Sequence, residues 1–235
     1  MKGSRDMRGS NWGGLCAGAL LTVLAGCAHQ SAPAQASGTV DVSGIVCKEA
    51  LQPEQRVDLE MVDTLMAKGR NYAALAQLEN DPMNAIDHWL RYGQLLAASG
   101  KLEESEEVYR AMANRCGDGR SEHGLGMVLL KRHEIMSAIS HLEKARDMSP
   151  ATSQVRNDYG YALLLVGRYE DAAFELRTAL ELANGQGPVR QNLAVAYLMD
   201  NNEKGIQELQ SQYGFSADEM AYAEKLSQQF GRVSP

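Results

Sequence analysis

Side chains suited to metal binding or catalysis are present, but not at the spacings that such sites need. His133 and Glu134 begin like the zinc-binding motif H-E-x-x-H, yet Ser137 stands where the second histidine ligand belongs. Three other histidines lack a partner ligand at metal-binding spacing: His88, His123 and His141. Neither a G-x-S-x-G nucleophile elbow nor a phosphate-binding loop occurs. We therefore expect no catalytic site, no metal, no cofactor and no small-molecule substrate.

The start of the chain indicates export and lipid attachment. Three basic residues precede an uncharged run at 15–24 that is too short to span a bilayer. The run ends in Leu-Ala-Gly-Cys at 24–27, which resembles the bacterial lipobox, where the signal is cleaved and the cysteine is acylated. We therefore predict a lipoprotein signal peptide over 1–26 and a lipid anchor on Cys27. The alternative is an ordinary signal peptide with a chance cysteine.

The residues after the lipobox favour the outer membrane and an oxidising compartment. Ala28 follows Cys27, whereas an aspartate there would resemble an inner-membrane retention signal. An outer-membrane protein facing the periplasm would keep Cys47 and Cys116 under oxidising conditions, which favours a disulfide over two buried thiols. The formal net charge of −7 argues against nucleic acid as a partner.

Small residues recur along the rest of the chain with a period near 34. One set is separated by 33, 34 and 34 residues: Gly93, Gly126, Gly160 and Ala194. After each, the chain turns, at Gly100, His133, Gly167 and Asn201. A second small residue follows five residues beyond two of these turns, at Ala138 and Ala172. This order and spacing resemble the tetratricopeptide (TPR) repeat, in which small residues let the two helices of a hairpin approach closely.

The repeat predicts an all-α fold, a TPR solenoid with a C-terminal capping helix. Four hairpins are expected at 86–118, 119–152, 153–186 and 187–212, after a degenerate unit at 55–85. A final helix is expected to begin near Ser216, with Glu219 completing a capping box. The predicted domains are the signal peptide (1–26), a lipidated flexible tether (27–50), the TPR array (51–212) and the capping helix (213–235).

In TPR proteins the first helix of each hairpin lines a concave groove. By the repeat register, the residues that face this groove are Leu90, Gln94 and Ala97; His123, Met127, Leu130 and Lys131; Asn157, Tyr161, Leu164 and Leu165; and Gln191, Val195, Leu198 and Met199. Such a groove is apolar with a polar edge and suits an amphipathic helix or an extended apolar peptide. We expect Tyr161, Val195 and Met199 to be its main contacts. The alternative for any one of these side chains is a place in the core.

The whole layout resembles the TadD-like lipoproteins of the tight-adherence (Flp/Tad) pilus. The lipobox at Cys27, the small repeat array and the stretch 187–198 carry the resemblance. It implies a pilotin that binds a segment of an outer-membrane secretin subunit, while its lipid carries that subunit to the outer membrane. The type IV pilus pilotin, which has a longer array, is an alternative. A scaffold for β-barrel insertion or for peptidoglycan enzymes is a rival of another class.

Overall fold

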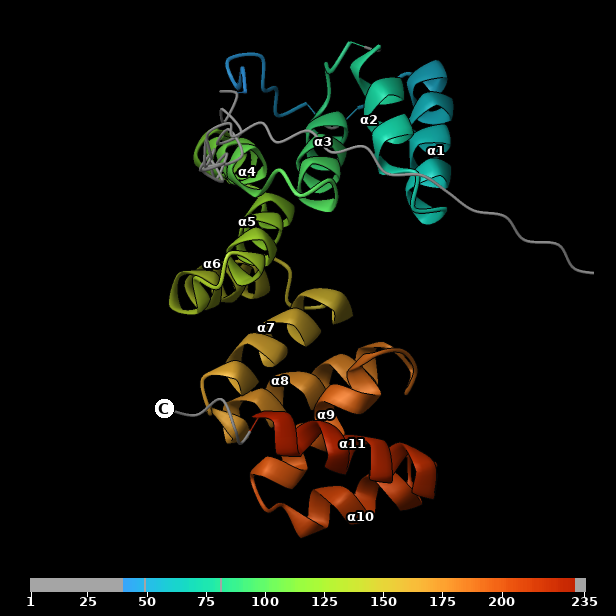
Figure 1. Ribbon diagram of the computed structural model, residues 1–235, viewed down its shortest axis with the longest axis vertical. Helices are drawn as coiled ribbons and strands as arrows, with labels where there is room; N and C mark the ends of the chain where they lie inside the picture. Colours follow the sequence, from blue (N-terminus) through green and yellow to red (C-terminus); the bar gives the residue numbers. More distant parts are fainter. Residues whose placement is uncertain (1–39, 49, 81, 231–235) are drawn as a thin grey trace, which may run out of the picture. The chain divides into compact units, whose positions relative to one another are not determined.

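The computed structural model describes residues 40–48, 50–80 and 82–230, and Figure 1 shows its helices. Cys27 and the predicted signal peptide lie outside the described residues. Within the described ranges the chain forms eleven α-helices and no strand, as the repeat predicts. The helices are α1 (Pro53–Ala67), α2 (Asn71–Glu79), α3 (Ile86–Ala98), α4 (Leu102–Cys116), α5 (Gly119–Lys131), α6 (Ile135–Met148), α7 (Ser153–Leu165), α8 (Tyr169–Leu182), α9 (Val189–Met199), α10 (Glu203–Ser211) and α11 (Ala217–Phe230). None of these helices is long and apolar enough to cross a membrane.

The first ten helices form five hairpins, and each hairpin turns in the same way. The turn residue has a left-handed backbone at Gly69, Gly100, His133, Gly167 and Asn201. The next N–H in each case donates to a carbonyl five residues back, as Lys101 N does to Leu96 O at 2.9 Å. Glycine adopts this backbone freely, and asparagine and histidine are among the other residues most often found there. The place of a residue in the repeat therefore determines where the hairpin turns, and the residue at that place need not be glycine.

Small residues sit where the two helices of a hairpin cross. A Cβ atom added to Gly126 would lie 2.6 Å from Leu142 Cγ, and one added to Gly160 would lie 2.6 Å from Leu176 Cγ. In the hairpin of α3 and α4 the close neighbour of a Cβ added to Gly93 is the ring of Tyr109, at 2.8 Å. Ala138, Ala172 and Ala194 are fully buried. These contacts are too short for a larger side chain, so residue size sets how closely the helices approach.

Part of the predicted tether is not free. We call residues 40–48 the N-terminal strap. Ile45 in the strap is 4% exposed and joins a core cluster that includes Trp89 of α3 and Met112 of α4. The carbonyl of Lys48 accepts a hydrogen bond from Ile86 N at 2.9 Å, at the start of α3. The prediction of a flexible tether up to residue 50 is thus wrong for the strap, because burial of Ile45 and pairing of its backbone fix it to the array.

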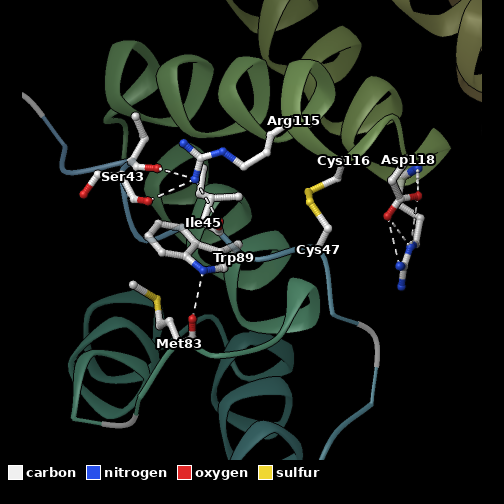
Figure 2. The surroundings of a disulfide bond; sticks show 10 residues. Ser43, Ile45, Cys47, Met83, Trp89, Arg115, Cys116 and Asp118 are labelled. Atoms are coloured by element: carbon white, nitrogen blue, oxygen red, sulfur yellow. Dashed lines mark hydrogen bonds and ion pairs between the residues drawn. A yellow bond between two sulfur atoms is a disulfide. The ribbon is translucent and has the colours of Figure 1, made fainter.

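Two contacts from the end of α4 hold the strap. Figure 2 shows the disulfide between Cys47 and Cys116, whose Cα atoms are 5.3 Å apart. Beside it, Arg115 Nη1 donates to the carbonyls of Val42, Ser43 and Ile45 at 3.4, 3.0 and 2.8 Å. The guanidinium therefore satisfies backbone acceptors that a docked extended segment would otherwise leave unpaired.

The C-terminal helix α11 packs on α9 rather than extending away from it, as Figure 1 shows. Ser216 N donates to Glu219 Oε2 at 2.9 Å and Glu219 N donates to Ser216 Oγ at 3.2 Å, so the predicted capping box forms. Met220 and Ala223 are buried in the core cluster that also contains α9. Phe230, at the end of α11, meets the ring of Tyr161 on α7 edge to face, with ring centroids 6.1 Å apart.

Candidate functional site: a groove along the first helices

A hollow in the described residues lies along the first helices of successive hairpins. It has a volume of about 500 Å³ and is lined by residues of α1, α3, α4, α5 and the start of α7. Six residues predicted to face the groove line it: Leu90, Gln94, Ala97, His123, Met127 and Lys131. The ninth repeat position contributes Gln94 on α3 and Met127 on α5. We call this hollow the groove cavity.

The other predicted groove residues are spread over neighbouring surfaces. Leu130 is half-buried between two core clusters, and Leu165 is half-buried at the end of α7. Leu198 and Met199 are half-buried against the core cluster that α11 completes. Tyr161 keeps 37% of its surface exposed while it contacts Phe230. Asn157 accepts a hydrogen bond from Asn192, whereas Gln191 Oε1 is buried and has no hydrogen-bond partner among the described residues.

Two predicted groove residues belong to the core instead. Leu164 and Val195 are each 1% exposed and lie in the core cluster around α7, α8 and α9. Val195 occupies the repeat position of Met127 and Tyr161, but α11 packs on α9, and Met220 and Ala223 of α11 lie in the same core cluster as Val195. The prediction of Val195 as a main contact is therefore wrong.

Charged residues that the sequence prediction missed form one wall of the groove cavity. Arg91 of α3 pairs with Asp63 of α1 at 3.0 Å and with Asp87 at 3.4 Å. Arg120 of α5 pairs with the same Asp87 at 3.1 Å and with Asp118 at 2.9 Å. The repeat register contained this signal, because Asp87 and Arg120 occupy the second position of their units and Asp63 the ninth position of the degenerate unit.

A second chain of polar contacts runs along α5, α7 and α9. His123 Nε2 lies 2.7 Å from Asp158 Oδ2, and Asn157 Nδ2 donates to Asp158 Oδ1 at 3.1 Å. Asn192 Nδ2 then donates to Asn157 Oδ1 at 2.9 Å. These side chains hold successive first helices in register. The same residues Asn157 and Asp158 line a smaller hollow of about 380 Å³ beside the loop at 186–189.

One aromatic residue forms the base of the groove cavity. Tyr109 of α4 is 6% exposed and donates its hydroxyl to Leu90 O at 3.0 Å. Burial raises the pKa of Tyr109 well above its usual range. Its hydroxyl therefore stays protonated at any physiological pH and serves as a fixed hydrogen-bond donor to the backbone.

The chemistry of the groove cavity is that of a recognition surface. His123 is paired with Asp158, but no described cluster of His, Cys, Asp or Glu side chains could hold a metal ion. The wall offers arginines already paired with carboxylates, next to the apolar side chains of Leu90, Ala97 and Met127. Such a mixture of apolar base and charged wall binds a partner through burial and hydrogen bonding.

The stacked hairpins and their shared groove define a helical-repeat protein with an extended interaction surface. A family model described as a tetratricopeptide repeat matches residues 123–187. The TPR repeat-containing protein PA4299 of Pseudomonas aeruginosa is 32% identical over 188 residues, covering 80% of this chain and 76% of that protein. The chain belongs to the TPR repeat protein family, whose arrays are generally non-catalytic scaffolds that bind peptide or protein partners.

Solved structures agree on the fold. MamA AMB-1 superposes with a TM-score of 0.51 at 21% identity, covering 72% of this chain and 97% of that one. MamA MSR-1 gives a TM-score of 0.50 at 21% identity, with 76% and 99% covered. At this identity the likeness concerns the fold alone.

Proposed function

We propose that the protein is a lipid-anchored, periplasm-facing assembly factor of an Flp (Tad) pilus and acts as a pilotin. In this role it binds a segment of an outer-membrane secretin subunit and performs no catalysis. The lipobox at 24–27 and the resemblance of the chain to TadD-like lipoproteins support the cellular setting. The observation that carries the binding role is the groove cavity of about 500 Å³ along the first helices of a TPR array.

The composition of the groove cavity supports a client with one apolar and one charged side. Leu90, Ala97 and Met127 offer apolar surface, and methionine adapts its shape to different partners. Lys131 and the paired Arg91 and Arg120 favour acidic side chains at the edge of such a client. An amphipathic helix or an extended segment with this pattern fits the groove.

The proposed mechanism is tethering. Acyl chains on Cys27 would hold the array at the membrane, and each buried methylene of such a chain contributes about 0.8 kcal/mol. A secretin segment held in the groove would then share that anchor. The anchor raises the effective concentration of secretin subunits at the outer membrane and so favours their multimerisation without any covalent step.

A deletion strain tests the proposal. Loss of the gene should deplete secretin multimers from the outer-membrane fraction, and the intact gene should restore them. Neither Cys27→Ser, which removes the anchor, nor Met127→Glu, which places a charge in the groove cavity, should restore them. Met136→Glu is the matched control, because Met136 lies on α6 with 70% of its surface exposed and should complement fully.

Other outcomes would point elsewhere. Unchanged secretin multimers in the deletion strain would refute the pilotin role. Depletion of a type IV pilus secretin, broad loss of outer-membrane β-barrels, or altered peptidoglycan fragments would assign the groove to a different client.

A further inference from the structure

One position in each first helix stacks on the preceding hairpin. At the seventh repeat position, with spacings of 31, 33, 34 and 34 that match those of the hairpin turns, stand Met61, Tyr92, Leu125, Tyr159 and Leu193. The last three are 3% exposed or less, and Tyr92 is half-buried. Leu125 of α5, for example, lies in a core cluster with Trp89 of α3 and Met112 of α4. The seventh position is therefore a contact by which each repeat joins the one before it.

Met61 departs from this pattern because no helix precedes α1 within the described residues. Met61 is 55% exposed, and Val57, one turn earlier on the same side of α1, is 63% exposed. Figure 1 shows α1 on the far side of α2 from α3, at the end of the row of helices. We call Val57 and Met61 the N-terminal stacking face. Elsewhere in the array the first helix of a hairpin buries this face against the preceding hairpin, but no hairpin precedes α1 within the described residues.

Carboxylates surround the N-terminal stacking face. Glu54 and Glu60 lie three residues before and after Val57, and Asp58 lies three residues before Met61. Within the described ranges none of the three pairs with a cation. Exposed Arg56 precedes Val57 in α1, and Lys68 follows the end of the helix, so the carboxylates outnumber the nearby cations. The surface thus combines an apolar centre with a negatively charged border.

We propose that the N-terminal stacking face docks an amphipathic α-helix of a partner protein, whose apolar stripe is flanked by lysine or arginine. The partner helix lies where the second helix of a preceding hairpin would lie and covers Val57 and Met61, as Met112 of α4 packs in one cluster with Leu125 of α5. Basic flanking residues pair with Glu54, Asp58 and Glu60. This surface is separate from the groove cavity, and its occupant extends the array by one helix.

Charge distinguishes this partner from two others. A second copy of the chain docked through the same face would bring two sets of these carboxylates together, and like charges in contact oppose association. An anionic membrane surface would be repelled for the same reason. A basic helix is the occupant that satisfies both the apolar centre and its border.

Titration with a synthetic helix tests the proposal. The probe is an amphipathic peptide with a leucine stripe flanked by lysines, and the comparison peptide carries glutamates in place of the lysines. Fluorescence anisotropy with the full chain should show binding of the lysine peptide and at least tenfold weaker binding of the glutamate peptide. Met61→Ser should weaken lysine-peptide binding about tenfold. Glu60→Lys should weaken it as well.

Three controls make the result specific. Met136→Ser changes an equally exposed methionine on α6, and Met127→Ser changes the groove cavity, so both should leave peptide affinity unchanged. Circular dichroism of each variant checks that the array remains folded. Equal binding of both peptides, or full affinity in Met61→Ser, would overturn the proposal. Self-association in sedimentation that Met61→Ser abolishes would assign the face to a second copy and overturn it too.

Discussion

Gly126 and Leu142 illustrate how single residues set the spacing of the array. A Cβ on Gly126 would meet Leu142 Cγ at 2.6 Å, although alanine is otherwise the better helix former. The same contact recurs one repeat later between Gly160 and Leu176. The two shortest contacts are with side-chain atoms of Leu142, so shortening the leucine should relieve them, whereas the contact with the Ala138 carbonyl oxygen at 3.3 Å remains.

A double-mutant cycle measures that contact. Gly126→Ala should destabilise the array by about 1–3 kcal/mol through overpacking, and Leu142→Ala by about 2–5 kcal/mol through the cavity it leaves. Together they should cost at least about 1 kcal/mol less than the sum, as measured by urea denaturation. The cycle cancels the helix-propensity gain of the alanine.

The equivalent leucine supplies the control. Gly126→Ala combined with Leu176→Ala should be additive, because Leu176 contacts Gly160 of the next repeat instead. Additivity in the Gly126–Leu142 pair would contradict the account of close packing at this crossing.

Among the elements, α11 is held by an ion pair at its start. Glu219 Oε1 accepts a hydrogen bond from Arg190 Nε of α9 at 2.8 Å, and Glu219 Oε2 accepts one from Ser216 N. These contacts lower the pKa of Glu219 to about 2, with the Arg190 hydrogen bond as the largest cause. Arg190 also lies over the ring of Phe215, 3.9 Å from its centroid.

The lowered pKa of Glu219 makes the docking of α11 pH-dependent. An ionised Glu219 contributes its full stabilisation above the unfolded-state pKa of 4.5. That contribution is lost as the pH falls from there through about 2. Glu219→Gln should therefore lower stability by about 1 kcal/mol near neutral pH, and this difference should shrink steadily below pH 4.5.

Thermal unfolding of both proteins across this pH range provides the measurement. Glu224→Gln is the matched control, since Glu224 is exposed on α11 and its carboxylate forms no ion pair among the described residues. A stability difference between wild type and Glu219→Gln that stays constant down to pH 2 would show that the ion pair does not hold α11.

Sequence periodicity predicts the elements well where neighbours in the chain decide the packing. The hairpins expected at 86–118 and 119–152 contain α3 with α4 and α5 with α6, because repeated small residues and turns specify them locally. The sequence predicts the disulfide between Cys47 and Cys116 but not the burial of the strap, because that burial also depends on Arg115 and on the core around Ile45, far along the chain. Val195 was misplaced because α11, which has no counterpart in the other repeats, covers it.

For the molecule as a whole, the repeats, the strap and α11 together leave one long stretch of first helices uncovered. The groove cavity extends over α1, α3, α5 and the start of α7, whereas α11 packs on α9. The register predicts Gln94 and Met127 in the lining of this cavity, whereas the pairing of Arg91 and Arg120 with carboxylates depends on contacts between helices that the structure shows. Client binding should therefore concentrate at the first two regular repeats.

Site-specific photo-crosslinking in the native membrane tests this central claim most directly. A photoreactive amino acid replaces Met127 in the groove cavity or, as the matched position, exposed Phe174 on α8. The account predicts a crosslink between position 127 and the secretin subunit, identified by mass spectrometry, and none from position 174. Crosslinking of the secretin from position 174 but not from 127 would contradict the assignment of the groove as its binding site.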